Sequence, residues 1–144
     1  MSPVTFVVLC SFLATINCDC SNEFDAVEEE CGKLYNLNPS HVFYYFTRGY
    51  YHLDANKVNG FVNCTWRKWN FLDANGKIDY TQIKRDSAIV WKFARFCPDL
   101  VINIKDYQDA FLRATYDCEA NSLLVTPESV RSCITESYEK YIEN

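Results

Sequence analysis

The sequence predicts an all-α protein of about six helices, and three observations carry that prediction. Apolar residues recur at helical spacing in several segments. No stretch alternates apolar and polar residues for long enough to predict a strand. Residues that suit helix N-caps, together with prolines, separate the segments. The 144 residues fit one domain, and no linker or low-complexity run divides them.

The first 18 residues predict a signal peptide. Residues 4–16 are almost entirely apolar or small, and no charged side chain precedes Asp19. This run is too short to span a bilayer but suits the apolar region of a secretory leader. The alternative is a buried first helix. We expect cleavage near Cys18–Asp19, a helical domain over 19–144 and a secreted, extracellular protein.

The first three expected helices follow one another with short breaks. Ser21 can cap a helix over 22–35, whose first turns are acidic. The Asn38-Pro39-Ser40 stretch then opens a second helix, HVFYYFTRGYY. Asn56 can cap a third, over 57–71.

The second half of the chain predicts three more helices. One starts at Asp79 or Tyr80 and ends at Pro98, with Val90, Phe93 and Cys97 on one face. The next carries a stripe at i, i+4, i+7 and i+11: Tyr107, Phe111, Ala114 and Cys118. Thr126-Pro127-Glu128 reads as an N-cap with proline at the first helical position. It opens a last helix whose apolar side consists of Val130, Ile134, Tyr138 and Tyr141.

The cysteines indicate a disulfide framework rather than a metal site. Cys10 and Cys18 leave with the leader, and six remain: Cys20, Cys31, Cys64, Cys97, Cys118 and Cys133. Six cysteines in a short secreted chain predict three disulfides with fifteen alternative pairings. No CxxC or Cys/His cluster is present, so zinc is not expected.

The net charge restricts the classes of binding partner, and one sequence motif predicts a modification. Fourteen Lys and Arg against 19 Asp and Glu give a net charge of −5. An acidic surface argues against nucleic acid and against an anionic membrane as partners. The Asn63-Cys64-Thr65 stretch is an N-glycosylation sequon whose middle residue is an expected disulfide cysteine.

The DANGKID stretch is similar to half of a calcium loop. With Gly76 at position 6, Asp73, Asn75 and Asp79 fall at positions 3, 5 and 9. Position 1 is Phe71 and position 12 is Gln82, so the bidentate ligand is missing. We therefore expect no metal here. Instead, the Asn75-Gly76 pair should close one helix in a left-handed conformation, and Asp79 should help to open the next.

No pattern of catalytic residues is evident. The only histidines are His41 and His52, and no serine or cysteine nucleophile pairs recognisably with either. With four glycines in the chain, there is no phosphate-binding loop. We expect neither an enzyme nor a cofactor.

Cysteine spacing and the residues around it are similar to a known family. Ten residues separate Cys20 from Cys31, and six separate Cys64 from Phe71 and an acidic turn. Near the end, Cys118 and Cys133 enclose EANSLLVTPESVRS. This pattern resembles the insect odorant-binding protein superfamily, and more closely its salivary branch in blood-feeding flies, the D-seven proteins and the small odorant-binding-like proteins of sand flies. The resemblance covers most of 19–144.

The chain departs from that family at two of its cysteines. Gly60 and Ile142 stand where the family has cysteines, and Cys97 is extra. The resemblance then implies three pairs: Cys20–Cys64, Cys118–Cys133 and Cys31–Cys97.

The resemblance also implies a small-ligand cavity among the helices. Family members sequester eicosanoids or biogenic amines without turning them over. The amine pattern is matched only in part, because Lys33 and Tyr35 lie one position early and Phe61 replaces a histidine. The chain ends before the family's terminal carboxylates, for which the substitutes would be Glu136, Glu139 or Glu143.

A binding site for a lipid carboxylate needs different residues, which form an apolar tunnel with cations at its mouth. Aromatic and basic residues occur together on the second and third helices, and the sequence leaves open whether they line a cavity or fill a core. The candidate ligand-binding residues are Lys33, Tyr35, Phe43, Phe46, Arg48, Tyr51, Trp66, Trp69 and Tyr138.

We therefore expect a secreted, monomeric, non-catalytic salivary carrier of an eicosanoid, a biogenic amine or another lipid. Two alternatives stay open. One is a surface-mediated inhibitor of a host plasma protein in the contact pathway of haemostasis. The other is a general odorant or pheromone carrier outside saliva.

Overall fold

The described part of the chain is built from helices joined by short turns. The structure is a computed structural model that describes residues 25–49, 52–86, 88–94 and 103–143. The leader, Cys20, Tyr51 and Cys97 lie outside these ranges, as does the side chain of Arg48. Within them, no helix is both long and apolar enough to cross a bilayer.

Seven helices and no strand occur within these ranges, which confirms the all-α prediction. Leu72 and Ile78 alone form an isolated antiparallel bridge there. The helices are α2 (Ala26–Tyr35), α3 (Pro39–Arg48), α4 (Ala55–Lys68), α5 (Tyr80–Arg85), α6 (Ile89–Ala94), α7 (Ile104–Glu119) and α8 (Pro127–Glu143).

Three helices begin where the sequence predicts. Asn38, Asp79 and Thr126 each accept a hydrogen bond from the backbone N–H three residues on, at 3.0, 3.2 and 3.2 Å. Pro39 occupies the first position of α3. Each cap stabilises its helix by about 1 kcal/mol, because it satisfies a backbone donor that the helix leaves open.

Two predicted N-caps are wrong. Helix α2 is capped by Asp25 rather than Ser21, in a box in which Glu28 N–H donates to Asp25 Oδ1 at 2.8 Å and Asp25 N–H donates to Glu28 Oε1 at 3.3 Å. Helix α4 is capped by Asp54, which accepts from Asn56 N–H at 2.9 Å. In both cases the carboxylate also suits the positive end of the helix dipole.

The single helix expected from Asp79 or Tyr80 to Pro98 is two helices, α5 and α6. Asp86 follows α5 with an extended backbone, at φ −74° and ψ 108°. Its Oδ1 accepts from Ala88 N–H at 2.8 Å. A short aspartate side chain competes in this way for backbone donors and interrupts a helical pattern.

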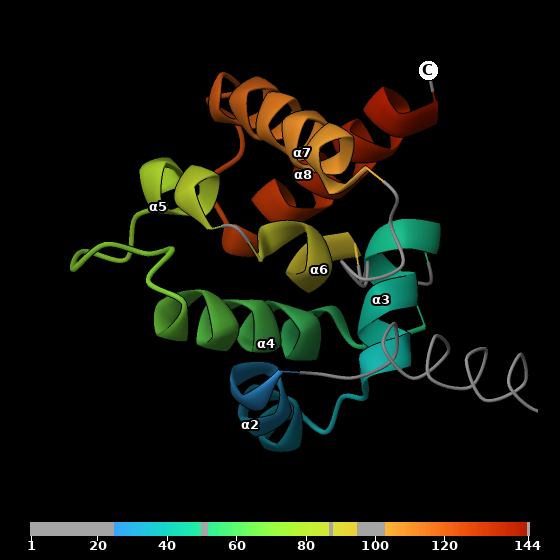
Figure 1. Ribbon diagram of the computed structural model, residues 1–144. Coiled ribbons are helices and arrows are strands. Elements are labelled where there is room, and N and C mark those ends of the chain that lie inside the picture. The colour runs from blue at the N-terminus through green and yellow to red at the C-terminus, as the bar shows by residue number, and fades with distance from the viewer. Residues whose placement is uncertain (1–24, 50–51, 87, 95–102, 144) are drawn as a thin grey trace, which may run out of the picture.

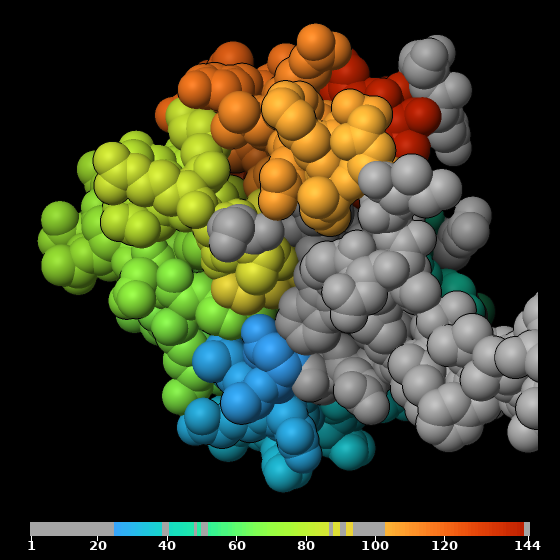
Figure 2. Space-filling view, viewed as in Figure 1, coloured from blue at the N-terminus to red at the C-terminus, as the bar shows by residue number. Residues whose placement is uncertain are grey.

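The helices stack in three tiers, seen in Figure 1. The α7–α8 hairpin forms the top tier, α4 crosses below it, and α2 packs on the far side of α4. Between the upper tiers lies α6, and α3 stands at one end against α8. Figure 2 shows α7 (orange) and α2 (blue) at opposite ends of the same face. The core between the tiers is mainly apolar and includes Val62, Phe93, Phe111 and Ile134.

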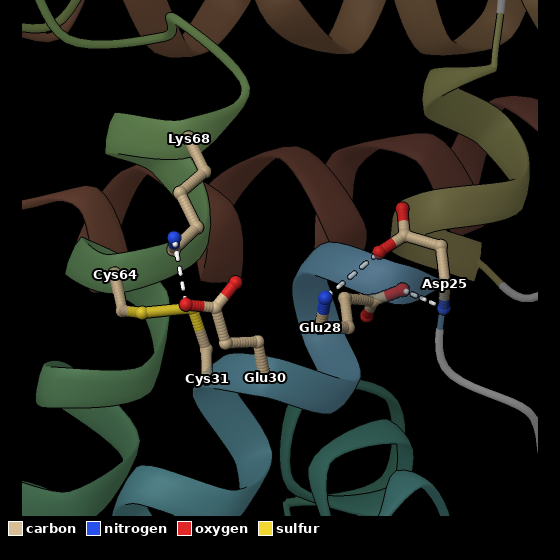
Figure 3. A network of polar contacts seen from close by, with 6 residues as sticks. All are labelled: Asp25, Glu28, Glu30, Cys31, Cys64 and Lys68. Atoms are coloured by element: carbon tan, nitrogen blue, oxygen red, sulfur yellow. Dashed lines mark hydrogen bonds and ion pairs between the residues drawn. A yellow bond between two sulfur atoms is a disulfide. The ribbon is translucent and has the colours of Figure 1, made fainter.

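Two disulfides are present in the described residues, and one confirms its prediction. Cys118 pairs with Cys133, with 6.0 Å between their Cα atoms. Cys31 pairs with Cys64 at a Cα–Cα distance of 5.8 Å, so the predicted Cys20–Cys64 and Cys31–Cys97 pairs are wrong. The physical reason is that α2 lies directly on α4 (Figure 3), which brings these two cysteines within bonding distance.

Gly60 allows the close approach of α2 to α4. A Cβ at this position would lie 2.2 Å from Cε1 and 2.5 Å from Cζ of Tyr35. No side chain larger than hydrogen fits there while the Tyr35 ring stays in place. A glycine–aromatic contact therefore occupies the position at which the resembled family has a cysteine.

Candidate functional site

Four aromatic rings meet at the centre of the core, around Phe93 of α6. Trp66 of α4 stacks on Phe93 with 5.8 Å between ring centroids and 8° between planes. Phe71 lies edge-on to both rings, and Phe111 of α7 lies edge-on to Phe93 at 5.7 Å. All four side chains are buried, so α4, α6 and α7 meet here.

A buried arginine adjoins these rings. Arg131 of α8 is 0% exposed, and its guanidinium carbon lies 4.3 Å from the ring centroid of Phe46 and 5.1 Å from that of Phe93. Ring faces attract a cation, and the attraction grows when water is excluded. A buried charge is otherwise costly, which makes such a residue a candidate for function. We call Phe46, Phe93 and Arg131 the arginine cluster.

Two further polar atoms of the core are buried without a hydrogen-bond partner among the described residues. One is Nε1 of Trp66, whose ring stacks on Phe93. The other is the hydroxyl of Tyr138, two turns after Arg131 on α8. Each such atom costs about 1–3 kcal/mol relative to a satisfied one. Buried polar atoms in native proteins are normally hydrogen-bonded, so these two atoms indicate that a water or a ligand bonds to them.

Tyr138 is also held in its neutral form. Burial raises the pKa of Tyr138 far above its usual value, and the nearby Tyr107 and Glu139 raise the pKa further. The Tyr107 and Tyr138 rings lie 6.4 Å apart. The Tyr138 hydroxyl therefore remains a hydrogen-bond donor at any physiological pH.

The structure brings some of the predicted ligand residues together. Phe46 and Trp66 both adjoin Phe93 or Arg131, and Tyr138 follows on the same helix as Arg131. Trp69 lies further out, half-buried against Phe71 at 5.7 Å. Phe43 is half-buried beside the exposed Tyr44.

Lys33 and Tyr35 have other roles in α2. Lys33 is exposed and pairs with Glu29 at 3.1 Å, on the rim of an open surface depression of about 450 Å³. Tyr35 packs its half-buried ring against Gly60. The two residues that match part of the amine pattern thus lie in a surface ion pair and a helix contact.

Arg131 is the residue that the sequence reasoning missed. The predicted apolar side of the last helix consists of Val130, Ile134, Tyr138 and Tyr141; the first three are buried, whereas Tyr141 is exposed. Arg131 falls inside the same stripe when it is widened by one residue. An arginine within an apolar stripe was the available signal. Lys92 was missed as well: its ammonium lies 4.7 Å from the Trp69 ring centroid and 2.6 Å from Asp86.

The DANGKID stretch forms a hairpin turn. Asp73 Oδ1 accepts from the N–H groups of Asn75 and Lys77 at 2.8 and 2.9 Å, and Gly76 has φ +77°. The left-handed glycine was predicted, but it turns this hairpin rather than closing α4. Helix α4 ends at Lys68 with Trp69 as its C-cap, and Asn70 then takes the left-handed φ of 60°. No group of three potential metal-ligating side chains occurs in the ranges that the structure describes.

The loop between α7 and α8 exposes apolar side chains. Leu123 is 85% exposed and Val125 is 75% exposed. Asn121 organises the turn, since its Oδ1 accepts from Leu123 N–H at 3.1 Å. The Cys118–Cys133 disulfide ties both flanking helices together at the base of this loop.

Comparison with known proteins gives no relative for this chain: no protein-family model, curated protein or solved structure matches it significantly.

Proposed function

We propose that the chain is a secreted, non-catalytic carrier that sequesters one small amphipathic molecule at the arginine cluster. The observation that carries this proposal is the pair of buried, unpartnered donors, Trp66 Nε1–H and Tyr138 O–H. A ligand that accepts hydrogen bonds from both would remove a cost that the described protein groups leave in place.

The two buried donors favour a head group that accepts hydrogen bonds. The indole Nε1–H of Trp66 can only donate, and the Tyr138 hydroxyl can donate as well. A carboxylate accepts hydrogen bonds, whereas an ammonium only donates them. Of the two mediator classes that the resemblance implies, a carboxylate-bearing lipid such as an eicosanoid therefore fits better than an amine.

Secretion is part of the proposal. Disulfides form and persist in oxidising compartments, and two are present in the described residues. The apolar, uncharged stretch over 1–18 has the composition of a leader.

Titration calorimetry of the oxidised mature protein tests the carrier proposal. The panel consists of serotonin, histamine, a cysteinyl leukotriene, a thromboxane mimic and a long-chain fatty acid. We expect saturable one-to-one binding of a carboxylate ligand. Tyr138→Phe, which keeps its ring and loses its donor, should weaken binding by about two- to tenfold, the worth of one hydrogen bond. Trp66→Phe loses the donor together with one ring of the buried indole, so it should weaken binding at least as much.

Tyr141→Phe is the matched control. The Tyr141 hydroxyl donates to the exposed Asp117 carboxylate and lies away from the core, so its loss should leave affinity unchanged. No heat from any ligand, with helicity verified by circular dichroism, would reject the carrier proposal.

A second candidate is a surface-mediated inhibitor of a host haemostasis protein. The exposed Leu123 and Val125 on the α7–α8 loop favour it, because apolar side chains on a braced loop suit a protein contact. If this function holds, Leu123→Asp with Val125→Asp abolishes inhibition of contact activation in a plasma clotting assay. An unchanged clotting time with the unsubstituted protein would reject it.

A further inference from the structure

The sequon Asn63-Cys64-Thr65 lies inside a helix. It occupies the second half of α4, which spans Ala55–Lys68. Asn63 is exposed, and its Nδ2 donates to Asn59 O at 3.1 Å. A glycosylated asparagine keeps one amide hydrogen, so this hydrogen bond can persist beneath a glycan. The folded protein can therefore carry a sugar at Asn63.

The other two sequon residues are committed to the fold. Thr65 is 0% exposed, and its Oγ1 donates to Val62 O at 3.1 Å. Cys64 is bonded to Cys31, whose side chain is buried. Figure 3 shows this bond joining α2 to α4, beside the Glu30–Lys68 ion pair of 3.1 Å.

Transfer of a glycan needs a geometry that α4 does not offer. The Asn63 amide nitrogen attacks the anomeric carbon of a lipid-pyrophosphate-linked oligosaccharide. The new N–C bond forms, the bond from that carbon to the phosphate oxygen breaks, lipid pyrophosphate leaves with the electron pair, and the amide loses one proton. The transferase reads the asparagine and the hydroxyl two residues on together, which is why sequons belong to accessible segments. In a helix, residues two apart point to nearly opposite faces.

We propose that Asn63 is an N-glycosylation acceptor only until the Cys31–Cys64 disulfide closes, so that glycan addition and closure compete for the same newly made chain. Closure oxidises two thiols by exchange with the disulfide of a secretory oxidoreductase, which leaves as a dithiol. The glycan can be added before the disulfide closes, because Asn63 remains exposed in the folded protein. If the disulfide closes first, the sequon becomes inert, because Cys64 is then bonded to α2 and Thr65 is buried with its hydroxyl donating to Val62 O.

Translation of the full chain into microsomes tests this order. The readout is the glycosylated fraction, seen as a glycosidase-sensitive gel shift that Asn63→Gln abolishes. We expect partial occupancy in the unsubstituted chain. Cys31→Ala, which leaves the sequon intact, should raise occupancy from a minority to a majority, and so should a reductant added during translation.

The second disulfide supplies the matched control. Cys118→Ala with Cys133→Ala also removes a crosslink but does not touch the sequon, so occupancy should stay at the unsubstituted level. An equal rise in this control would overturn the local mechanism in favour of slower folding in general. Unchanged occupancy after Cys31→Ala would overturn it too, as would complete occupancy of the unsubstituted chain under oxidising conditions. Because occupancy is set before folding ends, a variant that fails to fold still reports.

This inference rests on the secretory route of the proposed function and not on ligand binding. A chain in which a heterologous leader precedes residues 19–144 distinguishes failure of the secretion proposal from failure of the proposed competition at Asn63. Failure of the chain to enter microsomes with its own leader would count against secretion alone, whereas the heterologous leader still tests the competition at Asn63.

Discussion

Gly60→Ala should destabilise the protein, although alanine is the better helix former. In an exposed helix this change adds about 1 kcal/mol of stability. Here the new methyl carbon would lie 2.2 Å from the Tyr35 ring, well inside contact distance. Overpacking of this kind costs about 1–3 kcal/mol, so after the gain in helix propensity the net effect is a loss of up to about 2 kcal/mol.

A double-mutant cycle with Tyr35→Ala isolates the contact. Without the ring, Gly60→Ala meets no clash and should stabilise the protein by up to about 1 kcal/mol. The assay is urea unfolding followed by circular dichroism, with free energies from linear extrapolation. A change of sign between the two backgrounds is the expected result. If Gly60→Ala stabilises the unsubstituted protein, or has the same effect in both backgrounds, the packing argument is refuted.

Two further predictions concern the disulfides and alkaline pH. Replacing Cys31 and Cys64 by alanine should lower the free energy of unfolding by about 4 kcal/mol, because this bond spans 33 residues. Replacing Cys118 and Cys133 should lower it by about 3 kcal/mol, because that bond spans 15 residues. Unfolding midpoints in urea measure both losses, and a larger loss from the shorter loop would contradict this order. Burial raises the pKa of Tyr138 in the folded protein, so the unfolded chain loses the Tyr138 proton first as the pH rises above about 10. The contribution of Tyr138 to stability is therefore fully present below about pH 10. Above that pH, the free energy of unfolding falls by up to about 1.4 kcal/mol per pH unit. Tyr138→Phe should flatten that decline in a series of alkaline urea titrations, and an unchanged slope would contradict the assignment.

Local signals predicted much of the secondary structure. Asn38-Pro39, Asp79 and Thr126-Pro127 begin helices as expected, because a cap depends on a side chain and a backbone N–H three residues away. The break between α5 and α6 was missed although its cause is also local. Asp86 lies within an otherwise helical pattern, and its preference for bonding Ala88 N–H was outweighed in the prediction by the apolar residues around it.

The cysteine pairs show where sequence reasoning reached its limit. The Cys118–Cys133 pair, which the family resemblance implied, joins consecutive helices of one hairpin. Cys31 and Cys64 meet because α2 packs across α4, and that packing depends on the absence of a side chain at Gly60 opposite Tyr35. No spacing rule contains this information, because it is a contact between surfaces.

By itself, the sequence determined the helical class, most of the caps and the left-handed conformation of Gly76, since each follows from residues close together in the chain. Only the tertiary structure decided which aromatic side chains are central and which cation they surround. In the sequence, Arg131 is one more charged residue on an amphipathic helix. In the structure, Phe46 of α3 and Phe93 of α6 pack against its guanidinium group. Burial is a property of all the surfaces that meet at a residue, and those surfaces come from distant parts of the sequence.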